Sequence, residues 1–334
     1  MTEVHVVLPN DIDDPATPSG GNVYDRRLCA SLATMGWSTT EHPVPGDWPH
    51  PLPADRAGLA HVLGALPDDA VVLLDGLVAS AVPDVLLSHA NRLREVVLVH
   101  MPLRDVAERE ALGGAPAVIA TSEWTRSRLL EEHGLPADRV HVAPPGVDPA
   151  PLAPGTASGS RLLCVAAVTA HKGHDLLAAA LATLPEARCV CVGPVTRDPG
   201  FVTRLRTDRL RLAGPLTGTD LDAAYAAADL LVLPSRGDAY GMVVTEALAR
   251  GIPVLTTTAG GLPEALGQAP DGSLPGLLIE PGDRTALAGA LRRWLGEPDL
   301  RRRLRRAARA RRETLSGWAD TAQRVSGVLD RVAG

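Results

Sequence analysis

The chain has 334 residues, enough for two domains of ordinary size, and 45% of them are hydrophobic, which is sufficient for packed cores. Its formal net charge of −6 excludes a general nucleic-acid binder, because there is no basic surplus to displace counterions from phosphates. No apolar run is long enough to span a bilayer, and the chain opens on a strand pattern without a charged leader. We therefore expect a cytoplasmic protein.

Short, continuously apolar runs alternate with helical patterns through the first half of the chain. Runs that lack polar alternation are typical of parallel strands covered by helices on both faces. The predicted strands are residues 4–8, 71–74, 96–99, 118–120 and 140–143.

A glycine pair stands between the first strand and the first helix. We expect an irregular loop over residues 9–19 that ends in Gly20-Gly21-Asn22, followed by a helix to about Met35 that Gly36 stops. Glycines at this point permit close approach of the backbone to a ligand, and a tight turn is the alternative. The proline-rich residues 42–54 predict an open loop.

Two polar residues follow the carboxyl ends of predicted strands. Asp75 follows the run at 71–74 and His100 the run at 96–99, and ligands bind at this edge of open parallel sheets. For His100, a structural role is the alternative. Ser122 is predicted to cap the following helix.

The second half of the chain repeats the alternation. Residues 144–159, rich in proline and glycine, predict an interdomain linker. Two consecutive α/β runs then predict two Rossmann-like domains. The second run contains strand patterns at 162–168, 189–193, 210–214, 230–234, 252–256 and 277–279, and helical patterns at 175–184, 201–206, 220–228, 242–250, 284–295, 301–312 and 318–332.

Lys172 is the only lysine among 33 basic residues. It lies in His171-Lys172-Gly173, just after the first strand of the second run. We expect a compact ammonium on a flexible stem to be needed there, and chance survival on a loop is the alternative.

Residues 235–266 carry two acids around a helix start. A loop with Asp238 and Gly241 precedes the helix at 242–250, which carries Glu246 eight positions after Asp238. A bent loop could aim both carboxylates into one crevice. The helix dipole and the free N–H groups around Gly241 and Met242 would attract a diphosphate.

This stretch resembles the donor-site motif of retaining family-4 glycosyltransferases of the GT-B fold, which reads Glu, seven residues, Glu, Ala-hydrophobic-Ala, Gly-x-Pro-Val and Gly-Gly. The matching residues are Glu246-Ala247-Leu248-Ala249, Gly251-Ile252-Pro253-Val254 and Gly260-Gly261.

The sequence departs from the family motif at two places. The first Glu is Asp238 here, with about 1.5 Å less reach. The arginine expected five or six residues before Lys172 is replaced by Ala166 and Ala167. Arg197 or Arg236, both in loops after strands, could substitute for that cation.

The resemblance implies an α/β protein of the GT-B fold, with two Rossmann-like domains facing a central cleft. Residues 1–148 would form the acceptor domain, 149–314 the donor domain, and 315–334 a C-terminal helix that returns to the first domain. The tetrad Pro145-Gly146-Val147-Asp148 matches the family at its domain junction.

The resemblance also implies the site residues. Asp238, His100 and Lys172 would be catalytic, and Asn22 and Asp75 would lie on the acceptor side. The implied donor-binding residues are Gly20, Gly21, Lys172, Arg197, Asp238, Tyr240, Gly241, Met242, Val243 and Glu246.

The implied activity is that of a hexosyltransferase-like enzyme, which moves a sugar from a nucleotide diphosphate to an acceptor hydroxyl with retention. The aromatic content of 3% argues against a long stacking platform for polysaccharide, so we expect a small soluble acceptor. No metal and no cofactor besides the nucleotide-sugar substrate are expected, despite the Asp-x-Asp pattern at Asp11 and Asp13.

Several alternatives stay open. A non-hydrolysing nucleotide-sugar epimerase would share the fold, and a non-catalytic sugar-nucleotide binder would explain both departures from the motif. We expect a monomer or homodimer, without a transmembrane segment but with peripheral membrane contact still open.

The cysteines and the arginine-rich end complete the predictions. Two thiols without a second ligand pair are a weak metal signal, so we expect buried free thiols at Cys29, Cys164, Cys189 and Cys191. Residues 292–312 are expected to expose arginines on two helices around an apolar stripe, with a partner or membrane patch as the alternative.

Overall fold

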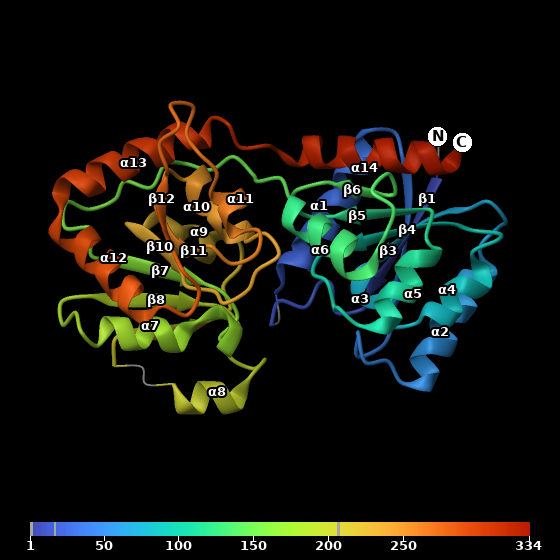
Figure 1. The fold of residues 1–334 in the computed structure, drawn as a ribbon, viewed down its shortest axis with the longest axis horizontal. Helices are drawn as coiled ribbons and strands as arrows, with labels where there is room; N and C mark the ends of the chain where they lie inside the picture. The colour runs from blue at the N-terminus through green and yellow to red at the C-terminus, as the bar shows by residue number, and fades with distance from the viewer. Residues whose placement is uncertain (1–2, 17, 206–207) are drawn as a thin grey trace. The chain divides into compact units, whose positions relative to one another are not determined.

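The computed structural model describes residues 3–16, 18–205 and 208–334. The chain divides into two compact units. The first is built mainly from residues 3–146 together with Ser316–Gly334, and the second mainly from Val147–Leu315 (Figure 1). Each unit contains one six-stranded sheet in which every strand pair is parallel.

The first sheet has the strand order β2-β1-β3-β4-β5-β6. Its central strands are buried along almost their whole length because helices cover both faces. The strands are β1 (Glu3–Pro9), β2 (Ser38–Val44), β3 (Val71–Asp75), β4 (Arg94–Val99), β5 (Ala117–Ala120) and β6 (Val140–Val142).

Helices cover the two faces of this sheet unequally (Figure 1). One face packs against a core that includes Leu63, Leu86, Leu112 and Leu129. The helices that supply it are α2 (Pro53–Ala65), α3 (Gly76–Ser80), α4 (Pro83–His89), α5 (Val106–Gly114) and α6 (Glu123–His133).

The other face carries α1 (Gly20–Thr34) and the C-terminal α14 (Trp318–Ala333) side by side (Figure 1). The Trp318 ring packs edge-on against Tyr24 of α1, with ring centroids 5.6 Å apart. Trp37 Nε1 also donates to Ser326 Oγ of α14 at 2.9 Å. The last helix is therefore a structural part of the first unit.

The second sheet has the order β12-β11-β10-β7-β8-β9. It consists of β7 (Arg161–Val165), β8 (Arg188–Val192), β9 (Leu210–Gly214), β10 (Leu230–Leu233), β11 (Val254–Thr257) and β12 (Gly276–Ile279). Two apolar cores lie on its two faces. The first core involves the helices α7 (His174–Leu181), α12 (Arg284–Gly296) and α13 (Pro298–Arg312). The second core involves α9 (Gly218–Ala226), α10 (Met242–Ala249) and α11 (Leu262–Leu266). The short helices η1 (Ala170–Lys172) and α8 (Pro199–Arg204) complete the unit.

Most predicted elements are confirmed, but two predictions near the N-terminus are wrong. Residues 42–44 and 53–54 are not part of an open loop, because Ser38–Val44 forms the edge strand β2 and α2 begins at Pro53, whereas residues 45–52 lie outside helix and strand as predicted. An edge strand tolerates polar residues, and these residues are the reason that the sequence pattern does not indicate a strand here. Gly20 and Gly21 are not in a loop either: they open α1, whose N-cap Ser19 accepts a hydrogen bond from Asn22 N.

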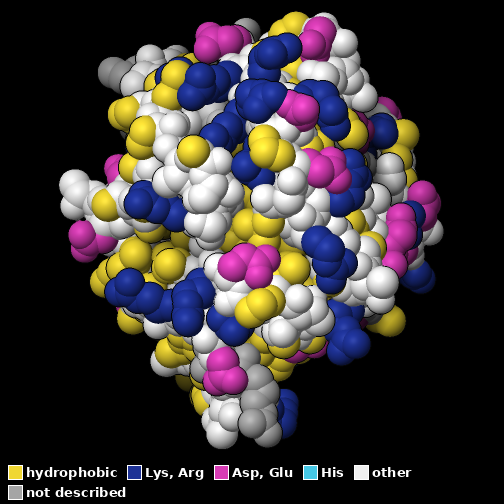
Figure 2. Space-filling view, turned by 90° about the vertical axis from the view of Figure 1, so that its left-hand side faces the viewer, with side chains coloured by type: hydrophobic (Ala, Val, Ile, Leu, Met, Phe, Trp, Pro, Cys, Tyr) yellow, Lys and Arg dark blue, Asp and Glu magenta, His cyan; other side chains and the backbone are white. Residues whose placement is uncertain are grey.

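The arginine-rich end packs as expected, with an apolar stripe on the inner side of α12 and α13. Leu291, Trp294, Leu304 and Ala308 are buried. Figure 2 shows the face of the second unit toward which these helices lie, with basic side chains at several places and acidic and hydrophobic ones between them. Arg301 departs from the prediction, because it is buried and donates to the carbonyls of Trp294 and Leu295.

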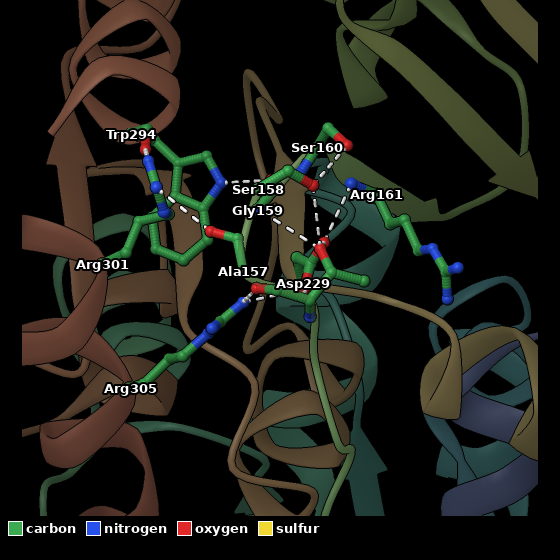
Figure 3. Close-up of polar contacts among 10 residues, drawn as sticks. Ala157, Ser158, Gly159, Ser160, Arg161, Asp229, Trp294, Arg301 and Arg305 are labelled. Atoms are coloured by element: carbon green, nitrogen blue, oxygen red, sulfur yellow. Dashed lines mark hydrogen bonds and ion pairs between the residues drawn. The ribbon is translucent and has the colours of Figure 1, made fainter. Parts of the chain in front are cut away.

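A buried aspartate anchors the segment that enters the second sheet (Figure 3). The Asp229 side chain is 0% exposed and accepts hydrogen bonds from Thr156 Oγ1 at 2.6 Å and Arg161 N at 3.1 Å. Arg305 of α13 donates to it at 2.7 Å, and Trp294 Nε1 holds the same segment by donating to Gly159 O at 2.7 Å. This network ties residues 156–161 to α12 and α13.

We predict that Asp229→Ala lowers the free energy of unfolding of the second unit by about 3 kcal/mol, because the buried donors around it lose their hydrogen-bond acceptor. The matched control is Asp299→Ala, which removes the exposed partner of Arg302 on the same helix α13 and should cost below about 1 kcal/mol. Hydrogen exchange of the β7 and β10 amides measures the second unit by itself. Equal effects of the two substitutions would contradict the anchoring role.

Candidate functional site

Each sheet reverses its strand order beside its first strand. In the first sheet β2 lies on one side of β1 and β3 on the other, and in the second sheet β8 and β10 flank β7 in the same way. The loops that leave the two strands at such a reversal turn to opposite faces and open a crevice at their carboxyl ends. Three predicted site residues lie at these reversals: Lys172 and Asp238 follow β7 and β10, and Asp75 ends β3.

In the second unit, the loop after β7 meets the loop after β10. Lys172 ends η1 and its Nζ donates to Asp238 Oδ2 at 2.7 Å. The two side chains are 19% and 12% exposed, so the pair is largely enclosed but reachable from solvent. Gly173 makes this approach possible: its φ is +75° and a Cβ there would lie 2.1 Å from Pro234 O.

The loop that carries Asp238 leads directly into α10. Gly241, with φ +90°, precedes the helix, and no side chain caps the first turn. Backbone N–H groups at an uncapped helix start are available to an anion. Met242 and Val243 form this first turn and are partly buried, as is the preceding Tyr240.

Gly260 and Gly261, the glycine pair of the motif, pack against the backbone of the loop that carries Asp238. A Cβ at Gly260 would lie 1.8 Å from Asp238 O, and one at Gly261 would lie 2.1 Å from Ala239 O. Gly261 N donates to Asp238 O at 2.9 Å. Only glycine therefore lets the two loops touch, and this contact fixes the backbone that carries Asp238.

Glu246 has a different partner from Asp238. Its Oε2 accepts a hydrogen bond from Tyr225 OH at 2.7 Å, and burial raises the pKa of the Glu246 carboxyl. Arg250 lies over the Tyr225 ring, 4.5 Å from its centroid. Within the described residues no hydrogen bond or ion pair joins Asp238 and Glu246, so the predicted sharing of one crevice stays a prediction.

The two candidate replacements for the missing upstream arginine are placed differently. Arg236 forms a two-pronged pair with Asp175, at 2.7 and 2.8 Å, and its backbone N donates to His171 O. Its charge is therefore already balanced. Arg197 is exposed on the loop after β8.

In the first unit, His100 meets two buried aspartates. Its Nε2 lies 2.9 Å from Asp25 Oδ1 and 3.5 Å from Asp75 Oδ2. Burial alone would lower the pKa of His100, but the charges of Asp25 and Asp75 and the hydrogen bond to Asp25 raise it to about 9. Burial and the charge of Asp25 raise the pKa of Asp75 to about 7.

Of Gly20, Gly21 and Asn22, Gly21 is the one that the structure brings against His100. A Cβ at Gly21 would lie 3.2 Å from Cδ2 of His100, so the helix backbone packs directly on the ring. Asn22 Nδ2 donates to Asp11 O at 3.3 Å. Asp13, the second acid of the Asp-x-Asp pattern, is paired with Arg26 Nε at 2.7 Å.

Asp25 was missed by the sequence interpretation. It lies one helical turn after Gly21, so the two residues share the face of α1 that contacts His100. That spacing from the glycine pair is the signal that could have identified it.

In the part of the chain that the structure describes, two groups of side chains have the composition of metal ligands. Asp25, Asp75 and His100 form one, and Cys164, His174 and Cys191 form the other; in each, one ligand atom per residue lies within 4.8 Å of the others. All four cysteines are buried free thiols, as predicted. The second group is fully buried in the core of the second unit.

Two family models match the chain. "Glycosyltransferase Family 4" matches residues 61–151 and "Glycosyl transferases group 1" matches residues 158–311. The chain is 32% identical over 252 residues to the D-inositol 3-phosphate glycosyltransferase of Frankia alni, covering 67% of this chain and 61% of the relative. It is 30% identical over 242 residues to the enzyme of that name from Pseudarthrobacter chlorophenolicus, covering 66% of this chain and 56% of the relative.

Solved structures match nearly the whole chain. Sucrose-phosphate synthase from Thermosynechococcus elongatus superimposes with a TM-score of 0.80 at 21% identity, covering 99% of both chains. Anabaena Alr3699/HepE, in complex with UDP and glucose, gives 0.77 at 16% identity, covering 99% of this chain and 100% of the other.

The chain belongs to the group 1 glycosyltransferases, with a family-4 match over residues 61–151, and it has the GT-B fold. Its match spans less than two thirds of the length of these curated relatives. Among the described residues, no helix combines the length and apolarity needed to cross a bilayer.

We predict that Gly260→Ala displaces the Asp238 loop and abolishes binding of a nucleotide diphosphate sugar, because the new methyl group cannot fit beside Asp238 O. Gly237→Ala on the same loop is the control, since a Cβ there meets nothing within 4 Å. Calorimetric titration measures binding, and a thermal melt shows whether each variant is folded. Wild-type affinity in a folded Gly260→Ala variant would contradict the fit described above.

Proposed function

We propose that the protein is a nucleotide-sugar-dependent glycosyltransferase that moves a hexosyl group to an acceptor hydroxyl with retention of configuration. The observation that carries this proposal is the Lys172–Asp238 pair, which lies in the crevice of the second sheet beside the uncapped start of α10. A lysine, a carboxylate and free backbone N–H groups together suit a glycosylated diphosphate.

The chemistry requires stabilisation of a leaving diphosphate. Lys172 would exchange its bond with Asp238 for the diphosphate oxygens, and the first-turn N–H groups of α10 would bind the same anion. Asp238, released from Lys172, would accept hydrogen bonds from sugar hydroxyls and balance the positive charge that develops at the anomeric carbon. Attack from the face of the leaving group, assisted by its phosphate, would give retention.

The other residues have supporting roles in this proposal. Glu246, held by Tyr225, would orient the ribose or the sugar. His100, Gly20 and Gly21 would contribute from the first unit, with Asn22 and Asp75 on the acceptor side. No metal is required, because Lys172 and the helix start supply the positive potential; chelation should therefore leave the transfer rate unchanged.

We propose a small soluble acceptor. Inositol phosphates are the first to test, because the curated relatives are named D-inositol 3-phosphate glycosyltransferases.

A non-catalytic sugar-nucleotide binder is the second candidate. It is favoured by the charge balance of the second unit, where Lys172 is paired with Asp238 and Arg236 with Asp175. Such a binder would bind donor without turning it over on any acceptor. An epimerase of the same fold would instead convert the donor with no acceptor present, so incubation with donor alone identifies it.

We predict that one class among UDP-, GDP- and ADP-sugars raises the melting temperature of the wild-type protein, since a ligand that binds only the folded state stabilises it by mass action. Lys172→Ala should remove this rise, because it takes away the ammonium that meets the diphosphate. Arg303→Ala, at an exposed position of α13, is the control and should retain it. Unchanged donor binding and transfer in Lys172→Ala would exclude the diphosphate role.

Asp238→Glu tests whether the site is built for the shorter acid. The Asp238 carboxylate already reaches Lys172 Nζ at 2.7 Å, so the longer side chain should misplace its oxygens by up to about 1.5 Å. We predict that turnover falls by on the order of a hundredfold. A rise in turnover would show instead that Asp238 is a weakened form of the family residue.

A further inference from the structure

The buried Asp25 carboxylate has one hydrogen-bond partner in the described part of the chain, the imidazole of His100. Its side chain is 3% exposed, and within the described residues its only hydrogen bond is to His100 Nε2. Asp75 differs, because its Oδ1 also caps α3 by accepting from Leu77 N at 2.7 Å. A buried carboxylate without a structural bond of its own has its effect through the imidazole that it holds.

The contacts of His100 fix both the ring and its proton. Ionised carboxylates only accept hydrogen bonds, so Nε2 carries a proton toward Asp25. Gly21 packs against Cδ2, and the Tyr24 ring meets the imidazole edge-on at 5.1 Å. Tyr24 itself is fixed by its OH, which donates to Ala143 O at 2.9 Å. Nδ1 makes no hydrogen bond to any described residue.

We propose that Asp25 is a positioning residue that holds His100 by Nε2 and keeps the imidazole protonated, so that Nδ1–H donates to a substrate oxygen. This rests on the proposed function, and it assigns His100 the role of a cationic hydrogen-bond donor rather than a general base. The oxygen that it binds belongs to a hydroxyl or phosphoryl group of the donor or acceptor.

The charges around the ring support this assignment. The titratable groups that face His100 are Asp25 from α1, Asp75 at the end of β3 and the Tyr24 phenol from α1. Burial raises the pKa of Tyr24 well above its usual value, so the phenol is neutral. The carboxylates stabilise the imidazolium, and His100 retains its second proton until the pH approaches its raised pKa of about 9.

The test is the titration of His100 in Asp25→Asn, followed by NMR of the imidazole ¹⁵N signals in the whole protein and assigned with His100→Gln. The amide keeps the shape of the side chain but removes its charge. We expect the pKa of His100 to fall by about 1 to 3. Asp84→Asn, at an exposed acid paired with Arg56, is the matched control and should leave the titration unchanged.

A second measurement separates positioning from folding. With a donor and acceptor pair that the wild type uses, kcat of Asp25→Asn should fall by on the order of a hundredfold. The high-pH limb of its rate profile should move to lower pH, because the imidazole then loses its proton earlier. A variant that merely lost stability would keep the wild-type profile at a lower active fraction.

The outcomes of the two measurements are distinguishable. An unchanged pKa of His100 in Asp25→Asn overturns the positioning role, whatever the activity. An unmoved high-pH limb overturns the donor role of Nδ1–H. If the wild type transfers no sugar, the proposed function fails and with it the substrate role, while the titration still decides whether Asp25 controls the protonation of His100.

Discussion

The reversal of strand order beside β1 and β7 is the constraint on which the rest of the molecule depends. When all crossovers of a parallel sheet run in one direction, the loops after successive strands turn toward the same face of the sheet. Where the strand order reverses, two neighbouring loops turn toward opposite faces and are therefore separated. In the second unit these loops bring Lys172 to Asp238. In the first they bring α1, with Asp25, to Asp75 at the end of β3. The topology thus brings together polar residues that lie far apart in the chain.

Glycine then determines how closely the loops approach. Gly173 lies against Pro234 O and Gly260 against Asp238 O, at distances that exclude any Cβ. Both glycines also have positive φ, which other residues rarely adopt. The position of Asp238 is therefore fixed by backbone packing on two sides rather than by its own side-chain contacts. This explains why the glycines of the motif accompany the acids although they cannot contact a ligand through side chains.

Much of the fold could be predicted from the sequence, because buried parallel strands read as continuous apolar runs such as Val71–Asp75 and Leu230–Leu233. The prediction failed where tertiary context overrides local pattern. Ser38–Val44 is polar because it is an edge strand, and Gly20 and Gly21 enter α1 because Ser19 caps it. Lys172 and Asp238 were identified from a motif. Asp25 was not, because its significance depends on His100, which lies 75 residues further along the chain.

The two departures from the family motif can be understood together through charge. Replacing the upstream arginine by Ala166 removes one cation from the crevice, and Lys172 is then balanced by the single carboxylate of Asp238. A glutamate at 238 would extend its carboxylate about 1.5 Å further from the same backbone. That backbone cannot retreat, because Gly260 and Gly261 pack against it. The shorter acid therefore matches the position of Lys172. In the function proposed above, the diphosphate would have to compete with Asp238 for the ammonium. Breaking this pair would lower the affinity for the ligand and favour anions that bind the ammonium more strongly than the carboxylate does.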